Sequence, residues 1–202
     1  MRRTLTRFAL TVALMTGAAA PALSQPKLET AVFAGGCFWS MQHDMAPIRG
    51  VVSTEVGYEG GHVDHPTYEQ VSSETTGHLE SVKVTFDPAK VSYAALVEHY
   101  WRLIDPTDDG GAFCDRGPSY HSAIFVTSDQ RHAAEASLAA LNKDKRFAGH
   151  IVTQIRPATT FWPAEGYHQH YADKNPVNYF RYRVGCGKDG RVKQLWGAEA
   201  FK

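Results

Sequence analysis

A glycine pair near the start of the chain joins a short apolar stretch to a helical one. Residues 30–34 (Thr-Ala-Val-Phe-Ala) are small, β-branched or aromatic, and they predict a strand that runs into Gly35-Gly36. Over residues 38–48 apolar side chains recur every three or four positions, which predicts a helix. A turn this tight sets the helix directly against the end of the strand and places Cys37 at or near the first helical position.

Cys37 is a candidate nucleophile because of this position. A thiol at a helix start faces unpaired backbone N–H groups and the positive end of the helix dipole, and both lower its pKa. Two large aromatic residues, Phe38 and Trp39, follow directly and predict a binding pocket beside the thiol. The alternative interpretation is that Cys37 is a small buried residue of the core.

The first 24 residues have the features of a secretory signal peptide. Three arginines precede an apolar run over residues 8–20, and cleavage after Ser24, or after Ala22, fits the small-x-small rule. The apolar run is too short to remain as a permanent membrane span. We therefore predict export, by ordinary secretion rather than the twin-arginine route, and a periplasmic location for the mature protein.

Residues 25–202 have a length that suits one domain with its own core. Loss of the first 24 residues removes three arginines and no acid, which leaves 18 basic and 21 acidic side chains and a net charge of −3. Nucleic-acid binders carry a clustered basic surface instead. We predict a single domain that is monomeric and has no nucleic-acid partner.

The cysteines and histidines predict neither a disulfide framework nor a metal site. Three cysteines, Cys37, Cys114 and Cys186, follow the signal peptide, and an odd number leaves at least one thiol unpaired or exchanging. Zinc sites use closely spaced ligand pairs such as C-x-x-C, which this chain lacks. His168 and His170 are the closest histidine pair, and on a helix they would point apart.

Predicted strands and helices alternate without an internal repeat. The mixture predicts an α+β fold, a two-layer sandwich of one mixed β-sheet with packed helices around a ferredoxin-like core. Beyond Arg156 we expect long irregular segments, with a flexible C-terminal tail over about 181–202. The expected strands are 51–58, 79–86, 121–126 and 151–155, and the expected helices are 93–104 after Ser92, 128–141 after a Thr127–Gln130 capping box, and 163–170.

Strand 79–86 carries a candidate acid. Its apolar residues Val82, Val84 and Phe86 point to one face of the strand, and Glu80 has the same parity. The alternate residues, Ser81, Lys83, Thr85 and Asp87, face the other way. A carboxyl group on an apolar face is desolvated, which raises its pKa and keeps it protonated near neutral pH. The alternative is that Glu80 turns into water at the strand end.

Two loop tyrosines, Tyr68 and Tyr120, lie outside the apolar stripes of the predicted helices. Such residues either cover the core with a solvated hydroxyl or donate hydrogen bonds to a substrate oxygen. Both interpretations fit the sequence.

These residues belong to a series of short motifs in one order, which runs from about Thr30 to Phe180. The motifs are 35–39 (Gly-Gly-Cys-Phe-Trp), 57–61 (Gly-Tyr-Glu-Gly-Gly), 66–68 (Pro-Thr-Tyr), 76–80 (Thr-Gly-His-Leu-Glu), 86–88 (Phe-Asp-Pro), 115–124 (Asp-Arg-Gly-Pro-Ser-Tyr-His-Ser-Ala-Ile), 164–171 (Ala-Glu-Gly-Tyr-His-Gln-His-Tyr) and 174–176 (Lys-Asn-Pro). In this order they resemble the A class of the peptide methionine sulfoxide reductases.

The resemblance implies a catalytic domain that reduces methionine S-sulfoxide, free and in proteins, as repair of oxidative damage. It implies that Cys37 attacks the sulfoxide sulfur as a thiolate and becomes a sulfenic acid, while Glu80 protonates the sulfoxide oxygen. Tyr68 and Tyr120 would hold that oxygen, and Asp115 would orient the site.

The resemblance also implies that Phe38 and Trp39 enclose the methyl group of the substrate and that a second thiol forms a disulfide with Cys37. We expect Cys186, between two glycines of the tail, to be this resolving thiol. Cys114 is the alternative, either as an inert loop thiol or as a second redox partner. No bound cofactor is implied, and a thioredoxin-like dithiol would supply the electrons.

Two other classes of function stay open at this point. A cysteine hydrolase also uses a thiolate at a helix start, with a histidine base for which His78 is the nearest candidate. A redox-binding module would bind methionine sulfoxide peptides without turning them over.

Overall fold

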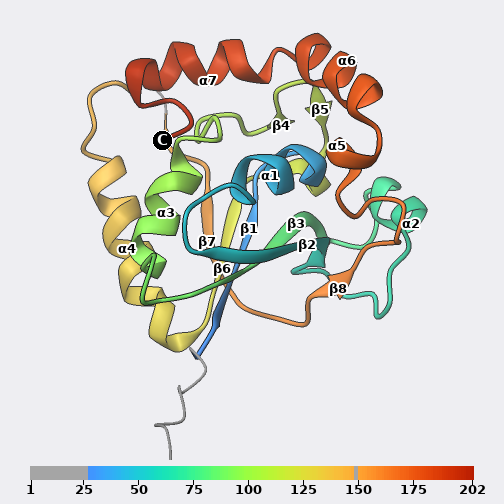
Figure 1. Ribbon diagram of the computed structural model, residues 1–202, viewed down its shortest axis with the longest axis horizontal. Coiled ribbons are helices and arrows are strands. Elements are labelled where there is room, and N and C mark those ends of the chain that lie inside the picture. The colour runs from blue at the N-terminus through green and yellow to red at the C-terminus, as the bar shows by residue number, and fades with distance from the viewer. Residues whose placement is uncertain (1–26, 148–149) are drawn as a thin grey trace, which may run out of the picture.

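The apolar strands pair into one six-stranded sheet in the order β7-β6-β1-β3-β2-β8 (Figure 1). The computed structural model describes residues 27–147 and 150–202, so the predicted signal peptide lies outside the described residues. The strands are β1 (Glu29–Ala34), β2 (Val51–Glu59), β3 (Leu79–Phe86), β4 (Gly111–Ala112), β5 (Asp115–Arg116), β6 (Ala123–Val126), β7 (Gln154–Pro157) and β8 (Trp162–Pro163).

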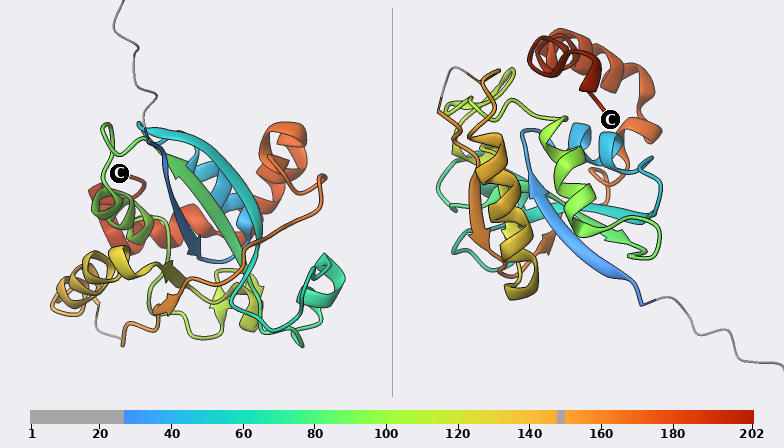
Figure 2. Two further views of the ribbon diagram at one scale, coloured as in Figure 1. Left: turned by 90° about the horizontal axis from the view of Figure 1, so that it is seen from below. Right: turned by 90° about the vertical axis from the view of Figure 1, so that its left-hand side faces the viewer.

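The helices pack around this sheet, and two of them run along one end of it (Figures 1 and 2). In the described residues no helix combines the length and the apolar character that a bilayer span needs. The helices are α1 (Phe38–Met45), α2 (Tyr68–Ser72), α3 (Tyr93–Trp101), α4 (Ser128–Leu141), α5 (Tyr171–Lys174), α6 (Pro176–Cys186) and α7 (Lys188–Trp196), with 3-10 turns η1 (Pro118–Tyr120) and η2 (Gly197–Glu199).

The central part of the sheet has the ferredoxin-like pattern that the sequence predicts. The succession β1-α1-β2-β3-α3-β6 gives the strand order β6-β1-β3-β2, in which every neighbouring pair is antiparallel. β7 adds to β6 in parallel after α4, and β8 adds to the other edge on β2. The two-layer α+β architecture is therefore confirmed, with a mixed sheet.

Strand β3 is central to the core because it pairs with both β1 and β2. Val82 lies opposite Phe33 on one side and Val56 on the other, and all three side chains are fully buried. Full burial of an apolar side chain of this size contributes roughly 1.5–3 kcal/mol relative to its exposure. Ser81 is on the opposite face of β3, as its parity predicts, and it is buried there because a second apolar cluster that includes Leu79 covers that face at this end of the strand.

Local signals predicted two helix starts correctly. The Ser92 hydroxyl accepts a hydrogen bond from the Ala95 N–H at 3.2 Å and caps α3. At α4 the Gln130 side chain accepts from the Thr127 N–H at 3.2 Å, as a capping box requires.

The C-terminal region differs most from the prediction. The expected irregular tail over 181–202 is largely helical, because α6 and α7 join at Gly187, whose φ of +72° suits glycine. Val192 and Trp196 are buried on the inner face of α7. Glycines within this stretch hide its helical pattern. Likewise, 163–170 forms no helix, and the last strand predicted at 151–155 begins three residues later, as β7.

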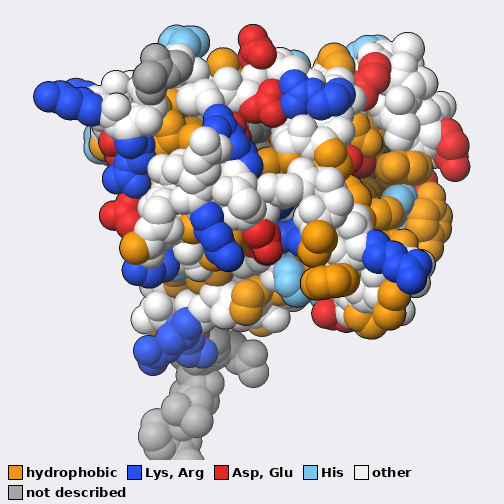
Figure 3. Space-filling model, turned by 90° about the horizontal axis from the view of Figure 1, so that it is seen from above, with side chains coloured by type: hydrophobic (Ala, Val, Ile, Leu, Met, Phe, Trp, Pro, Cys, Tyr) orange, Lys and Arg blue, Asp and Glu red, His pale blue; other side chains and the backbone are white. Residues whose placement is uncertain are grey.

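The outer side of α6 stays apolar and exposed. Seen from above, apolar side chains gather on the side of the molecule where α6 lies (Figure 3). Val177, Phe180 and Val184 are each more than half exposed on this helix.

A buried ion cluster fastens α7 to α1. Asp44 Oδ2 accepts from Lys188 Nζ and from Arg183 Nη1, each at 2.9 Å, and only 2% of Lys188 is exposed. Burial lowers the pKa of Lys188, while the charge of Asp44 opposes that shift. The carboxylate therefore compensates two cations that the fold has removed from water.

Replacing Asp44 with asparagine is expected to lower the free energy of unfolding by about 3–5 kcal/mol, because buried Lys188 then lacks its counter-charge and Arg183 keeps only its pair with the half-exposed Asp189. Urea denaturation at neutral pH measures the loss. Glu55→Gln is the matched control, since the Glu55–Lys83 pair is partly exposed and its loss costs less than about 1 kcal/mol. Equal losses in the two variants would show that burial does not strengthen the Asp44 cluster.

Candidate active site

Cys37 occupies the strand-to-helix turn that the sequence predicts. It is the N-cap residue of α1, and its carbonyl oxygen accepts from the Met41 N–H at 3.3 Å. Gly36 precedes it with a φ of +85°, and a Cβ built on this glycine would lie 2.6 Å from the Ala112 Cβ. Only glycine fits this turn without strain. The turn therefore brings the β4 loop directly against the residue before the thiol.

Glu80 lies beside this helix start, on the buried face of β3. Its side chain is 3% exposed, and Oε2 accepts a hydrogen bond from the Phe38 N–H at 2.9 Å. Burial raises the pKa of Glu80 to about 8, the charges of Asp115 and Glu74 raise it too, and the Phe38 hydrogen bond opposes them. The carboxyl group is therefore largely protonated at pH 7 and has a proton to donate.

Tyr68 and Tyr120 lie close to this acid. Tyr68 begins α2, where its N–H donates to Glu165 Oε1 at 2.8 Å, and Tyr120 ends the 3-10 turn η1. Burial raises the pKa of both, and the charge of Glu80 adds to the effect. Both therefore stay neutral and act as hydrogen-bond donors.

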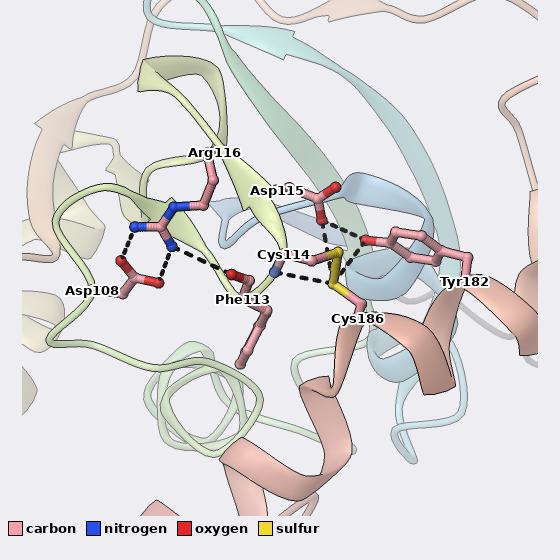
Figure 4. Close-up of a disulfide and its surroundings, with 7 residues drawn as sticks. All are labelled: Asp108, Phe113, Cys114, Asp115, Arg116, Tyr182 and Cys186. Atoms are coloured by element: carbon pink, nitrogen blue, oxygen red, sulfur yellow. Dashed lines mark hydrogen bonds and ion pairs between the residues drawn. A yellow bond between two sulfur atoms is a disulfide. The ribbon is translucent and has the colours of Figure 1, made fainter.

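Asp115 in β5 meets Tyr182 from α6 (Figure 4). The Tyr182 hydroxyl donates to Asp115 Oδ2 at 2.5 Å, and Tyr182 also lowers the pKa of Cys37. Burial raises the pKa of Asp115, whereas the Tyr182 hydrogen bond and the Lys188 charge lower it in part. Thus the structure brings Asp115 to the thiol together with a tyrosine that the sequence does not predict.

The aromatic residues after the thiol pack into a cluster. The Phe38 ring is buried, 5.0 Å from the His168 ring and 5.9 Å from the Tyr58 ring. The Trp39 ring is half-buried, stacks on Tyr171 at 3.7 Å, and donates from Nε1 to His168 Nδ1 at 3.0 Å. The contacts hold both rings firmly beside the thiol, and their role as walls of a methyl pocket stays a prediction.

The pKa of Cys37 differs from the prediction. Burial raises the pKa of this thiol, and the carboxyl groups of Glu80 and Asp115 raise it further, while hydrogen bonds from Tyr182 and from a backbone N–H lower it. The thiol is 9% exposed, and the first N–H of the helix already bonds to Glu80. Desolvation therefore outweighs the helix start, and the resting form is the neutral thiol.

The structure contains a disulfide that the sequence does not predict. Cys114 and Cys186 are bonded, with their Cα atoms 4.9 Å apart (Figure 4). Cys37 is a free thiol. The end of α6 lies against the β4–β5 hairpin, which brings together two sulfurs 72 residues apart in the chain. In the described residues the one group of three potential metal ligands is Cys114, Asp115 and Cys186, and this disulfide occupies its two sulfurs.

Comparisons with known proteins agree with this geometry. The family model described as peptide methionine sulfoxide reductase matches residues 29–200. The chain is 58% identical over 197 residues to the peptide methionine sulfoxide reductase MsrA 2 of Caulobacter vibrioides, covering 98% of this chain and all of that protein. It is 50% identical over 174 residues to MsrA of Bacillus subtilis, covering 86% of this chain and 98% of that protein. The chain belongs to the peptide methionine sulfoxide reductase family.

Solved structures of the family share the fold. Methionine sulfoxide reductase A of Corynebacterium diphtheriae aligns with a TM-score of 0.65 and 32% identity over 76% of this chain and 78% of that chain. Reduced Mxr1 of Saccharomyces cerevisiae aligns with a TM-score of 0.68 and 29% identity over 80% of this chain and 91% of that chain.

Two further residues of this reductase family member lie at the site without a role predicted from sequence. Glu165 accepts from the Tyr58 hydroxyl at 2.9 Å as well as from Tyr68, so it holds the loop that carries Tyr68. His168 accepts from Trp39, and burial lowers its pKa, so the ring is neutral. Both belong to the 164–171 motif, which singles them out in the sequence. Tyr182 lies in the region predicted as an irregular tail, where no motif singles it out.

His78, the histidine base that a hydrolase interpretation would use, is engaged elsewhere. His78 Nδ1 accepts from the Gly61 N–H at 3.1 Å, and Nε2 lies 2.8 Å from the Val63 carbonyl oxygen. Both ring nitrogens therefore hold a loop, and neither is free to accept a proton from Cys37.

Proposed function

We propose that the protein reduces methionine S-sulfoxide, free and in proteins, to methionine as repair of oxidative damage. The observation that carries the proposal is a buried free cysteine at a helix start beside a carboxyl group that is protonated at neutral pH. A sulfoxide needs both, because its sulfur accepts a thiol nucleophile and its oxygen leaves sulfur only when protonated. Family membership supports the same reaction.

In the first step Cys37 attacks the sulfoxide sulfur and Glu80 gives its proton to the sulfoxide oxygen. As methionine leaves, the oxygen ends on Cys37 as a sulfenic acid, and the proton of the thiol restores Glu80. The thiol sulfur is oxidised and the methionine sulfur is reduced, so no outside reagent is consumed. Tyr68 and Tyr120, both neutral, donate hydrogen bonds to the oxygen while its charge develops.

Phe38 and Trp39 suit the apolar side of the substrate. A sulfoxide sulfur carries a methyl group as well as its polar oxygen, and apolar rings bind a methyl without competing for hydrogen bonds. The aromatic cluster around His168 holds both rings in place before substrate arrives.

Two further steps regenerate Cys37. Cys186 attacks the Cys37 sulfenic acid, which forms a Cys37–Cys186 disulfide and releases water. Cys114 then attacks Cys186, which frees the Cys37 thiol and leaves the Cys114–Cys186 disulfide, the state seen in this structure. Cys186 thus keeps the predicted resolving role, and Cys114 takes part as the third thiol.

A thioredoxin-like dithiol completes the cycle by reducing the Cys114–Cys186 disulfide. Cys114 is exposed, whereas Cys37 is buried, so the second disulfide is the one that a protein reductant reaches. Moving oxidation from Cys37 to Cys114 therefore carries it from the core to the surface.

Single-turnover variants test this sequence of thiols. Reduced enzyme receives one equivalent of methionine S-sulfoxide without reductant, and peptide mass spectrometry locates the disulfides. We expect Cys114→Ser to stop at Cys37–Cys186 and Cys186→Ser to leave a Cys37 sulfenic acid that dimedone traps. Unchanged disulfide formation in Cys186→Ser would assign the resolving role to Cys114 instead. The R epimer serves as the control substrate and should yield no methionine.

We also propose that residues 1–24 direct export and that the mature protein works in the periplasm as a monomer. The support is the arginine-led apolar segment with a small-x-small cleavage site. N-terminal sequencing of protein from the periplasmic fraction tests the export, and retention of residues 1–24 in the cytoplasm would contradict it.

A further inference from the structure

The Tyr182 hydroxyl lies next to the disulfide and also acts on Cys37. It is 2.5 Å from Asp115 Oδ2 and 4.0 Å from Cys186 Sγ, and its presence lowers the pKa of Cys37. Asp115 in turn lies against the disulfide, with Oδ2 3.8 Å from Cys186 Sγ and a carboxylate oxygen within 4.8 Å of Cys114 Sγ. Asp115 and Tyr182 therefore form a hydrogen-bonded pair that lies against the disulfide, and Tyr182 also influences Cys37.

The chain itself places these groups together. Asp115 follows Cys114 directly, and Tyr182 precedes Cys186 by four residues on α6, which puts the two side chains on one face of the helix. When Cys114 and Cys186 come into contact, Asp115 and Tyr182 are brought side by side as well (Figure 4). The Tyr182 ring also meets Trp39 edge-on at 5.9 Å, which limits its movement.

The exchange between the two proposed disulfides moves one proton. Cys114 loses its thiol proton in order to attack Cys186 Sγ. The bond between Cys186 and Cys37 breaks as the new bond forms, and Cys37 leaves with the electron pair. Burial favours the neutral form of Cys37, so a proton must reach a site that is 9% exposed.

The groups around Cys37 form two sets, of which only one serves this exchange. Glu80 with Tyr68 and Tyr120 is assigned to the sulfoxide oxygen. Tyr182 bonds instead to Asp115, on the side of the disulfide. The remaining charged group that acts on Asp115 is Lys188, whose ammonium is paired with Asp44.

We propose that Asp115 and Tyr182 carry the exchange proton from Cys114 to Cys37. Asp115 accepts the proton of the Cys114 thiol, Tyr182 gives its hydroxyl proton to the departing Cys37 sulfur, and Asp115 then restores the hydroxyl. The net reaction converts a Cys114 thiol and a Cys37–Cys186 disulfide into a Cys114–Cys186 disulfide and a Cys37 thiol, with one proton transferred. This role rests on the thiol sequence of the proposed function.

Tyr182→Phe tests the proposal in full-length mature enzyme. Reduced protein is mixed with one equivalent of methionine S-sulfoxide and no reductant, quenched with acid at successive times, alkylated, and analysed for both disulfides by peptide mass spectrometry. We expect conversion of Cys37–Cys186 into Cys114–Cys186 to slow by about 10²-fold, the lower end of a general acid–base effect. The Cys37–Cys186 form then accumulates. Tyr179→Phe is the matched control, since Tyr179 is buried one turn earlier and bonds to Arg183 at 3.0 Å.

A double variant separates a proton path from a packing effect. Because Asp115 and Tyr182 act in series, Asp115→Asn with Tyr182→Phe should exchange no more slowly than the slower single variant. Losses that multiply in the double variant, or Tyr182→Phe exchange at the wild-type rate, would overturn the proposal. A wild-type sample that yields no methionine would instead refute the proposed function, and this role with it.

Discussion

Cys37→Ser is expected to abolish methionine sulfoxide reduction, with a fall in kcat/KM of about 10⁴-fold or more. A serine hydroxyl fits the N-cap position, but it is a poor nucleophile toward sulfur and forms neither a sulfenic acid nor a disulfide. Methionine released from the S epimer in the presence of dithiothreitol measures the loss.

The same variant has an internal control. Cys114 and Cys186 remain, so a general thiol oxidant still joins them, and circular dichroism should show an unchanged fold. Methionine sulfoxide, in contrast, should no longer cause this disulfide to form. If the sulfoxide still oxidised Cys114 and Cys186 in Cys37→Ser, another thiol would be the nucleophile and the assignment of Cys37 would be wrong.

Glu80→Gln is expected to lower kcat by between about 10²- and 10⁴-fold, the range for loss of a general acid. Glutamine keeps the size of the side chain, and its carbonyl oxygen still accepts the Phe38 N–H. It has no acidic proton for the sulfoxide oxygen. Substrate binding should change less than kcat, because the amide still hydrogen-bonds to that oxygen. A kcat within threefold of wild type would remove Glu80 from the acid role.

The pKa of Glu80 gives this prediction a second readout. Glu80 acts in its protonated form, so wild-type kcat should fall as the pH rises above about 8, and the residual activity of Glu80→Gln should lack this fall.

The free energy of unfolding depends on the ionisation of the same carboxyl group. Between its ordinary pKa of 4.5 and the folded value near 8, the folded chain retains a proton that the unfolded chain loses, so stability declines as pH rises through that window. Above pH 8 the Tm of Glu80→Gln should exceed that of wild type. A lower Tm would contradict the claim that ionisation of the buried Glu80 carboxyl group destabilises the folded protein.

Much of the scaffold follows from short-range patterns. Strand 79–86 and helix 128–141 have the predicted bounds, because alternation and capping are properties of neighbouring residues. The parity of Glu80 likewise placed it on the buried face. The tail was misjudged because its glycines weaken the helical signal, and packing of Val192 and Trp196 against the rest of the molecule compensates for them.

The strand-to-helix turn shows where local reasoning about the site ends. Two glycines and a helical repeat were enough to place Cys37 at the N-cap of α1. They did not determine its pKa, because burial and two carboxyl groups from distant segments outweigh the helix start. Desolvation depends on every segment that covers the thiol, and the residues around Cys37 do not determine which distant segments pack there.

The sequence by itself therefore determined the family motifs, the order of most strands and helices, and the positions of the thiol and the acid on their own elements. Only the tertiary structure decided that Cys114 pairs with Cys186, that Tyr182 reaches Asp115, and that the resting Cys37 is a neutral thiol. The physical reason is range. Periodicity and capping act between residues a few positions apart, whereas disulfide geometry, burial and charge act through space between segments that only the folded chain brings together.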